Sequence, residues 1–293
     1  AGSPRVHATD RAPRAAGTPS VVRLTWSQVQ HTRTILWRDS SAVFFAVAFP
    51  VVLAVIIPTV NGGGDATLSG GQPLGTFYAA TMAVYGAAVT GFVSMPEGLA
   101  QDRERGVLKR VRATPLPAVA LLVGRVVGAL AVALSTAVGI ALIAVILFRP
   151  VYPPGLPAAV LTLVVAAVCF AVLGLAVMSL ARSAQAGVGL ALGTLLPLAF
   201  ISDIFVIGAD FPGPLDAVAS FFPLRHAAQA MTTAVDPGVA GSGLSLDHLA
   251  VLLVWTLAGA AVVAVRFRWE SSEPARRGSR SRRLGRKASS TRR

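Results

Sequence analysis

Residues 97–117 read EGLAQDRERGVLKRVRATPLP, and an apolar run long enough to cross a bilayer lies on each side of this segment. Asp, Glu, Lys and Arg make up only 13% of the chain, whereas a soluble domain has about a quarter. Eight of these residues nevertheless fall between Glu97 and Pro117. Charge is costly inside a membrane. The pattern therefore predicts a short segment in water between two spans, helix-compatible and suited to docking another protein.

Outside this charged segment, the chain is apolar enough to predict an all-α, polytopic membrane protein. Hydrophobic residues make up 54% of the sequence, and each span needs about 20 mostly apolar residues. Pro50 and Pro58 are expected to bend the first span. Six spans are expected, at residues 42–60, 73–95, 118–148, 156–180, 186–207 and 248–265.

The basic residues predict the orientation of these spans. Of the 26 Lys and Arg residues, 23 lie before the first span, in the 97–117 segment, at Arg182 or from Arg266 onward. Only Arg149 and Arg225 belong to the other side, and Arg125 lies within the third span. Because cytoplasmic loops are enriched in Lys and Arg, both termini and the charged segment are expected to be cytoplasmic.

The two ends of the chain differ from the membrane domain, which is expected to span residues 21–270. Residues 1–20 are polar and the Ser/Arg-rich residues 271–293 are low in complexity, so both are expected to be disordered cytoplasmic tails. Residues 21–41 have apolar residues at helical spacing with Arg among them, which predicts an amphipathic helix at the membrane interface. The net charge of +13 follows from loops and tails, so lipid rather than nucleic acid is the expected partner.

No pattern for catalysis appears in the sequence. There is no Gly-rich phosphate loop, no His-Glu-x-x-His and no Cys-x-x-Cys, and the four histidines are scattered. The single cysteine, Cys169, lies in an apolar run, where a small buried residue is the expected role. We therefore predict no catalytic, metal-binding or cofactor-binding residue, and a protein that is not an enzyme.

One acidic residue stands out within a predicted span. Asp203 lies in the apolar sequence PLAFISDIFVIG, residues 197–208. Intramembrane carboxylates are typical of substrate and ion pathways. Asp203 either lines such a path or lies at the outer interface, where it costs little.

Several motifs resemble one membrane-protein family. The sequence ERGVLKR at 104–110, followed by RATPLP at 112–117, is similar to the cytoplasmic motif of type-two permeases of ATP-binding-cassette exporters of the daunorubicin and multidrug-resistance kind. Further similarities cover residues 21–266 and comprise Trp37-Arg38-Asp39, Phe49-Pro50, Ser202 to Phe205, and Phe222-Pro223-Leu224 with His226.

This resemblance implies a six-span permease that works as a homodimer or heterodimer above two cytoplasmic ATPase subunits. ATP and Mg²⁺ would bind only to those subunits. Short outer helices are implied at residues 215–235, and Asp203 and Phe205 become candidates for the substrate path. At position 203 the family leads us to expect Gly or another small residue. The implied ATPase-coupling helix comprises Arg103, Glu104, Arg105, Gly106 and Leu108.

The implied function is export of an amphipathic drug, antibiotic or lipid-like substrate across a bacterial plasma membrane, with efflux and antibiotic resistance as the biological setting. Two alternatives stay open. A secondary transporter driven by an ion gradient would need intramembrane ionisable groups, of which Asp203 is the clear candidate. A membrane scaffold without transport activity would act through the basic tail at 271–293.

Overall fold

The computed structural model describes residues 44–63, 66–68, 71–107, 118–148, 155–206 and 211–266, with side chains in the third long helix described from Leu121. The two predicted tails at 1–20 and 271–293 and the predicted interfacial helix at 21–41 lie outside the described residues. So does Leu108 of the predicted coupling helix.

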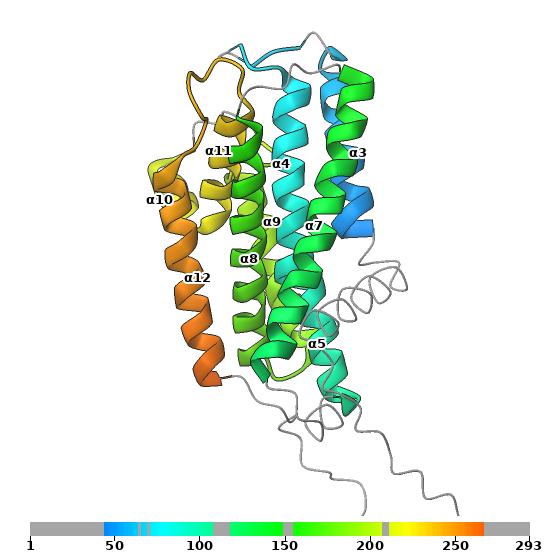
Figure 1. Cartoon of the computed structure of the whole chain (residues 1–293), viewed down its shortest axis with the longest axis vertical. Helices are drawn as coiled ribbons and strands as arrows, with labels where there is room; N and C mark the ends of the chain where they lie inside the picture. The colour runs from blue at the N-terminus through cyan, green and yellow to red at the C-terminus, as the bar shows by residue number, and fades with distance from the viewer. Residues whose placement is uncertain are drawn as a thin grey trace, which may run out of the picture.

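The described residues form an elongated bundle of helices whose axes run mainly along its long direction (Figure 1). The only strand-like feature among them is an isolated bridge between Thr67 and Pro73. The all-α prediction is thus confirmed for this part of the chain. The elements are η1 Phe44–Ala48, α3 Phe49–Val60, α4 Leu74–Ala88, η3 Val89–Ser94, α5 Met95–Glu104, α7 Ala118–Phe148, α8 Leu156–Leu180, α9 Ala184–Ile201, α10 Gly213–Phe221, α11 Pro223–Val235 and α12 Leu246–Arg266.

The helix α4 lies at the centre of the bundle. All of its residues except Ala79 are buried, and it contacts α3, α7, α8 and α11. Its sequence, LGTFYAATMAVYGAA, is rich in small residues, which let neighbouring backbones approach closely in a membrane protein. A side chain at Gly86 would place its Cβ 3.2 Å from the carbonyl oxygen of Ala46. Packing of small residues therefore holds the centre together.

The peripheral helices are apolar on all sides. Only 22% of the most apolar window of Leu121–Phe148 is buried within the chain, 28% of that of Ala184–Ile201 and 22% of that of Leu246–Arg266. A helix with an apolar outer surface is stable when hydrocarbon, or another apolar helix, surrounds it. Five helices are long and apolar enough to cross a membrane, and Phe44–Val60 is a shorter apolar helix.

The helix boundaries confirm some expectations and correct others. The third and fourth predicted spans coincide with α7 and α8. The helix of the second span does not end near residue 95, because α4, η3 and α5 form one continuous helical stretch, Leu74–Glu104. The fifth span ends earlier than expected, since α9 stops at Ile201 and residues 202–206 are turns and bends.

The second span contains a π-helical segment, η3, immediately before Pro96. A proline removes one backbone donor and its ring crowds the carbonyl four residues earlier, and widening of the helix accommodates both effects. At this level α8 passes very close, because a Cβ at Gly174 would lie 2.7 Å from the carbonyl oxygen of Gly91. The backbone of η3 is thus packed directly against α8.

Two short helices precede α12, as the resemblance implied for residues 215–235. The first, α10, is mostly exposed, whereas seven residues of α11 are buried. The helix α11 contacts α4, α8 and α12, and Figure 1 shows it among the upper ends of these helices. It therefore forms part of the bundle and does not merely cover its end.

Candidate functional site

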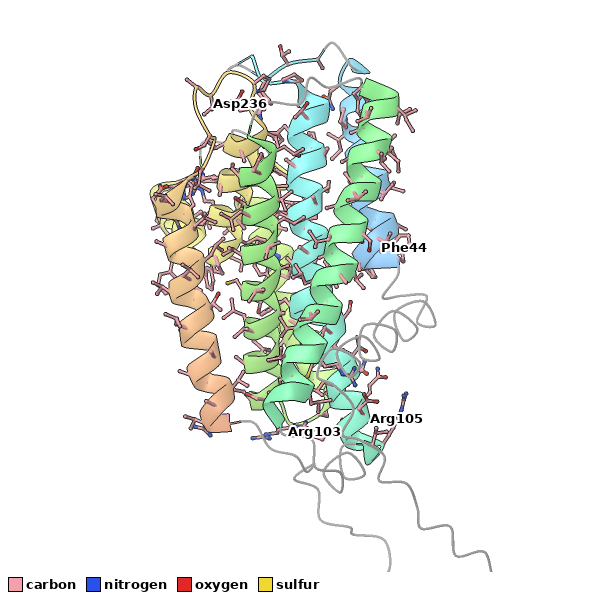
Figure 2. The ribbon with its side chains drawn as sticks, in the orientation of Figure 1. Phe44, Arg103, Arg105 and Asp236 are labelled. Atoms are coloured by element: carbon pink, nitrogen blue, oxygen red, sulfur yellow. The ribbon has the colours of Figure 1, made fainter. Side chains whose placement is uncertain are left out.

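The charged segment begins as the end of the second-span helix. Figure 2 shows Arg103 and Arg105 at one end of the bundle and Asp236 at the other. Arg103 lies in the last turn of α5, where a positive charge suits the helix dipole. The Gln101 amide donates a hydrogen bond to Glu97 at 3.1 Å. The charged residues are thus presented on a helix anchored in the centre of the bundle.

Four of the five predicted coupling residues lie together at the end of α5. Arg105 is the C-cap and is exposed, and Gly106 follows with a φ of +73°. The Gly106 N–H donates to the Arg103 carbonyl at 3.1 Å. Glycine suits this left-handed position because it has no Cβ. Gly106 therefore ends the helix and allows the chain to turn away from it.

Glu104 contacts another membrane helix. Its Oε1 accepts a hydrogen bond of 2.8 Å from the backbone N–H of Ala184, the first residue of α9. The Ser183 hydroxyl accepts a second bond, of 3.2 Å, from the N–H of Ala186. The first N–H groups of a helix lack partners within that helix, and a carboxylate is favourable at its positive end. Glu104 thus caps α9 from the end of α5.

An ion pair that the sequence analysis did not identify lies beside these residues. Arg125 of α7 donates to the Asp102 carboxylate of α5, and the two side chains are only 5% and 8% exposed. The sequence places Arg125 within a span but assigns it no partner. The sequence did indicate that Arg125 needs a partner, because a charge within a span requires a counter-charge. The acidic residues of α5 are Glu97, Asp102 and Glu104, and the structure pairs Arg125 with Asp102.

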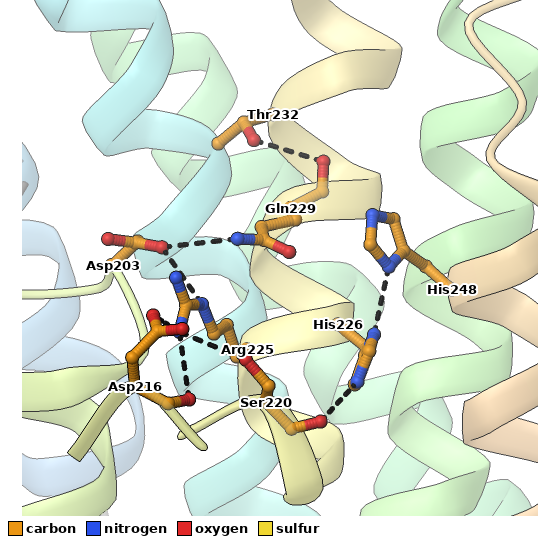
Figure 3. Close-up of polar contacts among 8 residues, drawn as sticks. All are labelled: Asp203, Asp216, Ser220, Arg225, His226, Gln229, Thr232 and His248. Carbon is orange, nitrogen blue, oxygen red and sulfur yellow. Dashed lines mark hydrogen bonds and ion pairs between the residues drawn. The ribbon is translucent and has the colours of Figure 1, made fainter. Parts of the chain in front are cut away.

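The substrate-path candidate Asp203 belongs to a polar cluster with Asp216 of α10 and with Arg225 and Gln229 of α11 (Figure 3). Its carboxylate lies 3.5 Å from Nε of Arg225 and accepts a 3.3 Å hydrogen bond from Gln229. Arg225 also pairs with Asp216 of α10 and donates to the Ser220 hydroxyl. Asp203 is therefore held by two side chains of α11. The cluster joins the end of α9 to α10 and α11.

The backbone explains why a small residue is expected at position 203. Asp203 has a φ of +57° and is the one residue other than glycine with positive φ among the described residues. This left-handed conformation is strained for residues with a Cβ, although Asp tolerates it better than most. The turn at Asp203 also explains why α9 ends at Ile201.

Two histidines meet beside this cluster. Nδ1 of His226 on α11 lies 2.8 Å from Nδ1 of His248 on α12, and Nε2 of His226 lies 2.8 Å from the Ser220 carbonyl. In such a pair of neutral rings one Nδ1 donates and the other accepts. Within the described ranges, no three His, Cys, Asp or Glu side chains are grouped so as to hold a metal ion. The histidine pair therefore connects α11 to α12.

The second substrate-path candidate, Phe205, lies in an aromatic cluster. Its ring centroid is 4.9 Å from that of Tyr85 and 6.0 Å from that of Phe49. Phe200 completes the group at 5.2 Å. Edge-on and tilted contacts of this kind are favourable. Phe205 thus connects the residues after α9 to α3 and the central α4, close in sequence to Asp203 but in an apolar environment.

Two apolar grooves lie between the helices. One, of about 270 Å³, is bounded by η3, α8, α9, α11 and α12, with Phe222 and Trp255 among its lining residues. Their rings stack at 5.9 Å. The other, of about 160 Å³, lies between α4, α7, α8 and α11. Almost every lining side chain in both is apolar, which suits lipid chains or amphipathic molecules.

Comparison with known protein families agrees with this architecture. A family model described as ABC-2 type transporter matches residues 23–235. The chain belongs to the ABC-2 type transporter family. No curated protein matches the sequence. The match covers α3 to α11, including the charged end of α5 and the polar cluster around Asp203 and Arg225, whereas α12 lies beyond it.

The family assignment confirms the resemblance inferred from the 104–117 motif. An ABC-2 type transporter domain is the membrane component of an ABC transporter, and the family generally works with an ABC ATPase. With five helices long enough to cross a bilayer, the chain is a multi-pass membrane protein. It is a transport component, not itself a catalyst.

Proposed function

We propose that this chain is the membrane subunit of an ATP-driven exporter that moves an amphipathic drug, antibiotic or lipid-like molecule out of a bacterial cell. Two copies of a separate cytoplasmic ATPase, which bind ATP and Mg²⁺, would supply the energy. A second permease protomer, identical or related, would complete the pathway. The helix Phe44–Val60, together with the residues before it, would provide the first span and bring the number of spans to six, with both termini in the cytoplasm.

The observation that carries this proposal is the projection of the second-span helix. The helical stretch Leu74–Glu104 has 31 residues, about 46 Å at 1.5 Å per residue. The hydrocarbon core is about 30 Å thick, so one end must extend beyond it. The charges of α5 identify that end. A continuous helix rooted in the centre of the bundle is suited to receive movement from a partner in the cytoplasm.

The substrate class is supported by the grooves between the helices. The larger groove presents apolar and aromatic side chains from several spans, and no ionisable side chain lines either groove. Apolar walls favour molecules that already partition into the bilayer. Asp203, the clear ionisable candidate for an ion-driven mechanism, is paired with Arg225 and lines neither groove.

Co-purification tests the proposal. The chain would be purified from its native host in lipid nanodiscs, and the proteins recovered with it identified by mass spectrometry. We expect an ATPase with a phosphate-binding loop in near-equal amount. Charge reversal at Arg105, Arg105→Glu, should remove the ATPase because Arg105 is exposed at the end of α5.

Arg266→Glu is the matched control, since it reverses a charge at the end of α12, outside the charged segment. This variant should retain the ATPase. If no ATPase is recovered in several mild lipid mixtures, the proposal is wrong. In that case, transport that collapses with the proton gradient would support a secondary transporter.

A further inference from the structure

Two acidic residues at the end of α5 contact two different membrane helices. Asp102 pairs with Arg125 on α7, and Glu104 caps the first residue of α9. Residues two apart on a helix are rotated by about 200° and therefore point in nearly opposite directions. The end of α5 is thus held on opposite sides, by the third predicted span and by the fifth.

The contact with α7 is buried. Both side chains of the Asp102–Arg125 pair are less than a tenth exposed, so water competes little with either partner. Charge–charge attraction is strong and directional in such surroundings. Arg125 belongs to the 31-residue helix α7. Displacement of α5 therefore pulls on the end of a helix that runs the length of the bundle.

The contact with α9 is of a different kind. Glu104 is exposed overall, and one of its carboxylate oxygens accepts the Ala184 N–H at 2.8 Å. This bond depends on an acceptor oxygen at the side-chain end, not on a full negative charge. The contact thus can be separated experimentally from any charge pairing of Glu104 with a partner protein.

We propose that Asp102, Arg125 and Glu104 are positioning residues that transmit movement of the charged segment separately to the third and fifth predicted spans. Asp102 and Arg125 move α7, and Glu104 moves α9. The inference rests on the proposed function, because an ATPase supplies the movement. It assigns Glu104 to contact within the chain and leaves ATPase docking to its neighbours, Arg103 and Arg105.

Distance measurements between spin labels test the two connections. Cys169 is fully buried, so labels would be attached through Gly189→Cys on α9 and, in a second protein, Val138→Cys on α7. Each would be paired with Leu161→Cys on α8. Gly189 has no atom within 4 Å of an added Cβ, and Val138 and Leu161 are exposed. Distances would be compared without nucleotide and with ATP and vanadate, in the complex with the ATPase.

The variants distinguish the two connections. Glu104→Ala should reduce the nucleotide-dependent change at α9 about fivefold in population, the effect of losing one hydrogen bond, and spare the change at α7. Glu104→Gln retains an acceptor oxygen and should behave like the parent. Asp102→Leu/Arg125→Met, which removes both charges of the buried pair, should have the converse effect, on α7 alone. Recovery of the ATPase should be unchanged in all three.

Other outcomes would overturn the inference. If each variant retains both changes, neither contact transmits movement. If each variant abolishes both changes, the connections are not separate. Loss of the ATPase with Glu104→Gln would show that the charge of Glu104 docks the partner. A parent chain that recovers no ATPase would instead refute the proposed function, and the inference with it.

Discussion

Removal of one partner from the Asp102–Arg125 pair should destabilise the protein far more than removal of both. The side chains are 8% and 5% exposed, so Asp102→Leu leaves a buried, uncompensated guanidinium and Arg125→Met leaves a buried carboxylate. Breaking a buried pair costs about 3–5 kcal/mol. At about 2–4 °C per kcal/mol for a domain of this size, each single variant should unfold roughly 6–20 °C lower.

The double variant Asp102→Leu/Arg125→Met removes both charges and fills similar space with apolar atoms, and such replacements are often neutral or stabilising. Thermal unfolding of all four proteins in the same nanodiscs completes a double-mutant cycle. With each single variant costing about 3–5 kcal/mol and the double variant near neutral, the expected interaction energy is about 6–10 kcal/mol. Asp216→Asn is the control, because Asp216 is 51% exposed in its ion pair and should cost about 1 kcal/mol or less.

Additivity would refute this reasoning. If the double variant loses as much stability as the two single variants together, the charges do not depend on each other. If Asp102→Leu is no worse than Asp216→Asn, the site is open to water and the burial argument fails.

Three further predictions concern packing and backbone conformation, and each is measured as the yield of monodisperse protein and its unfolding temperature. Gly174→Val should prevent correct packing, because its Cβ would meet a backbone carbonyl at 2.7 Å, whereas Gly189→Val meets no neighbouring atom in the chain and should be tolerated. Asp203→Gly should stay within about 1 kcal/mol of the parent, since relief of the left-handed strain offsets the lost Arg225 pair. Asp203→Ala, which retains the strain, should be less stable than Asp203→Gly. Tyr85→Phe should be neutral or slightly stabilising, because this fully buried hydroxyl has no hydrogen-bond partner among the described residues.

Hydropathy predicted the bounds of a helix well where the apolar run and the helix end at the same residue. The bounds of α7 and α8 agree with the expected spans, since proline-rich or polar sequence follows directly on their apolar runs. Hydropathy did not predict the end of the second helix, which continues past Met95 to Glu104. Loss of apolar character marks the edge of the bilayer, whereas backbone hydrogen bonding continues beyond it. Hydropathy also missed the end of α9 at Ile201, because the left-handed turn at Asp203 ends the helix within a sequence that stays apolar.

The candidate site was predictable only in part, because contacts between helices far apart in the sequence leave no local pattern. The motif at 104–110 identified the end of α5, and the structure places Arg103 to Gly106 together there. The partners of these residues depend on helices far away in sequence. Neither the contact of Glu104 with Ala184 nor that of Asp102 with Arg125 follows from local spacing. The histidines likewise looked scattered, and only the packing of α11 against α12 joins His226 to His248.

The buried position of α11 has a consequence for biosynthesis. Its 13 residues reach about 20 Å, too short to cross the bilayer, so it cannot be integrated as a span by hydrophobicity alone. It must enter a site lined by α4 and α8, which are made earlier, and α12 then closes that site from the other side. We expect a nascent chain that stops after Val235 to leave α11 unsheltered and to be degraded by membrane quality control. Insertion of α12 thus completes the site of α11, although α12 lies beyond the residues that the family model matches.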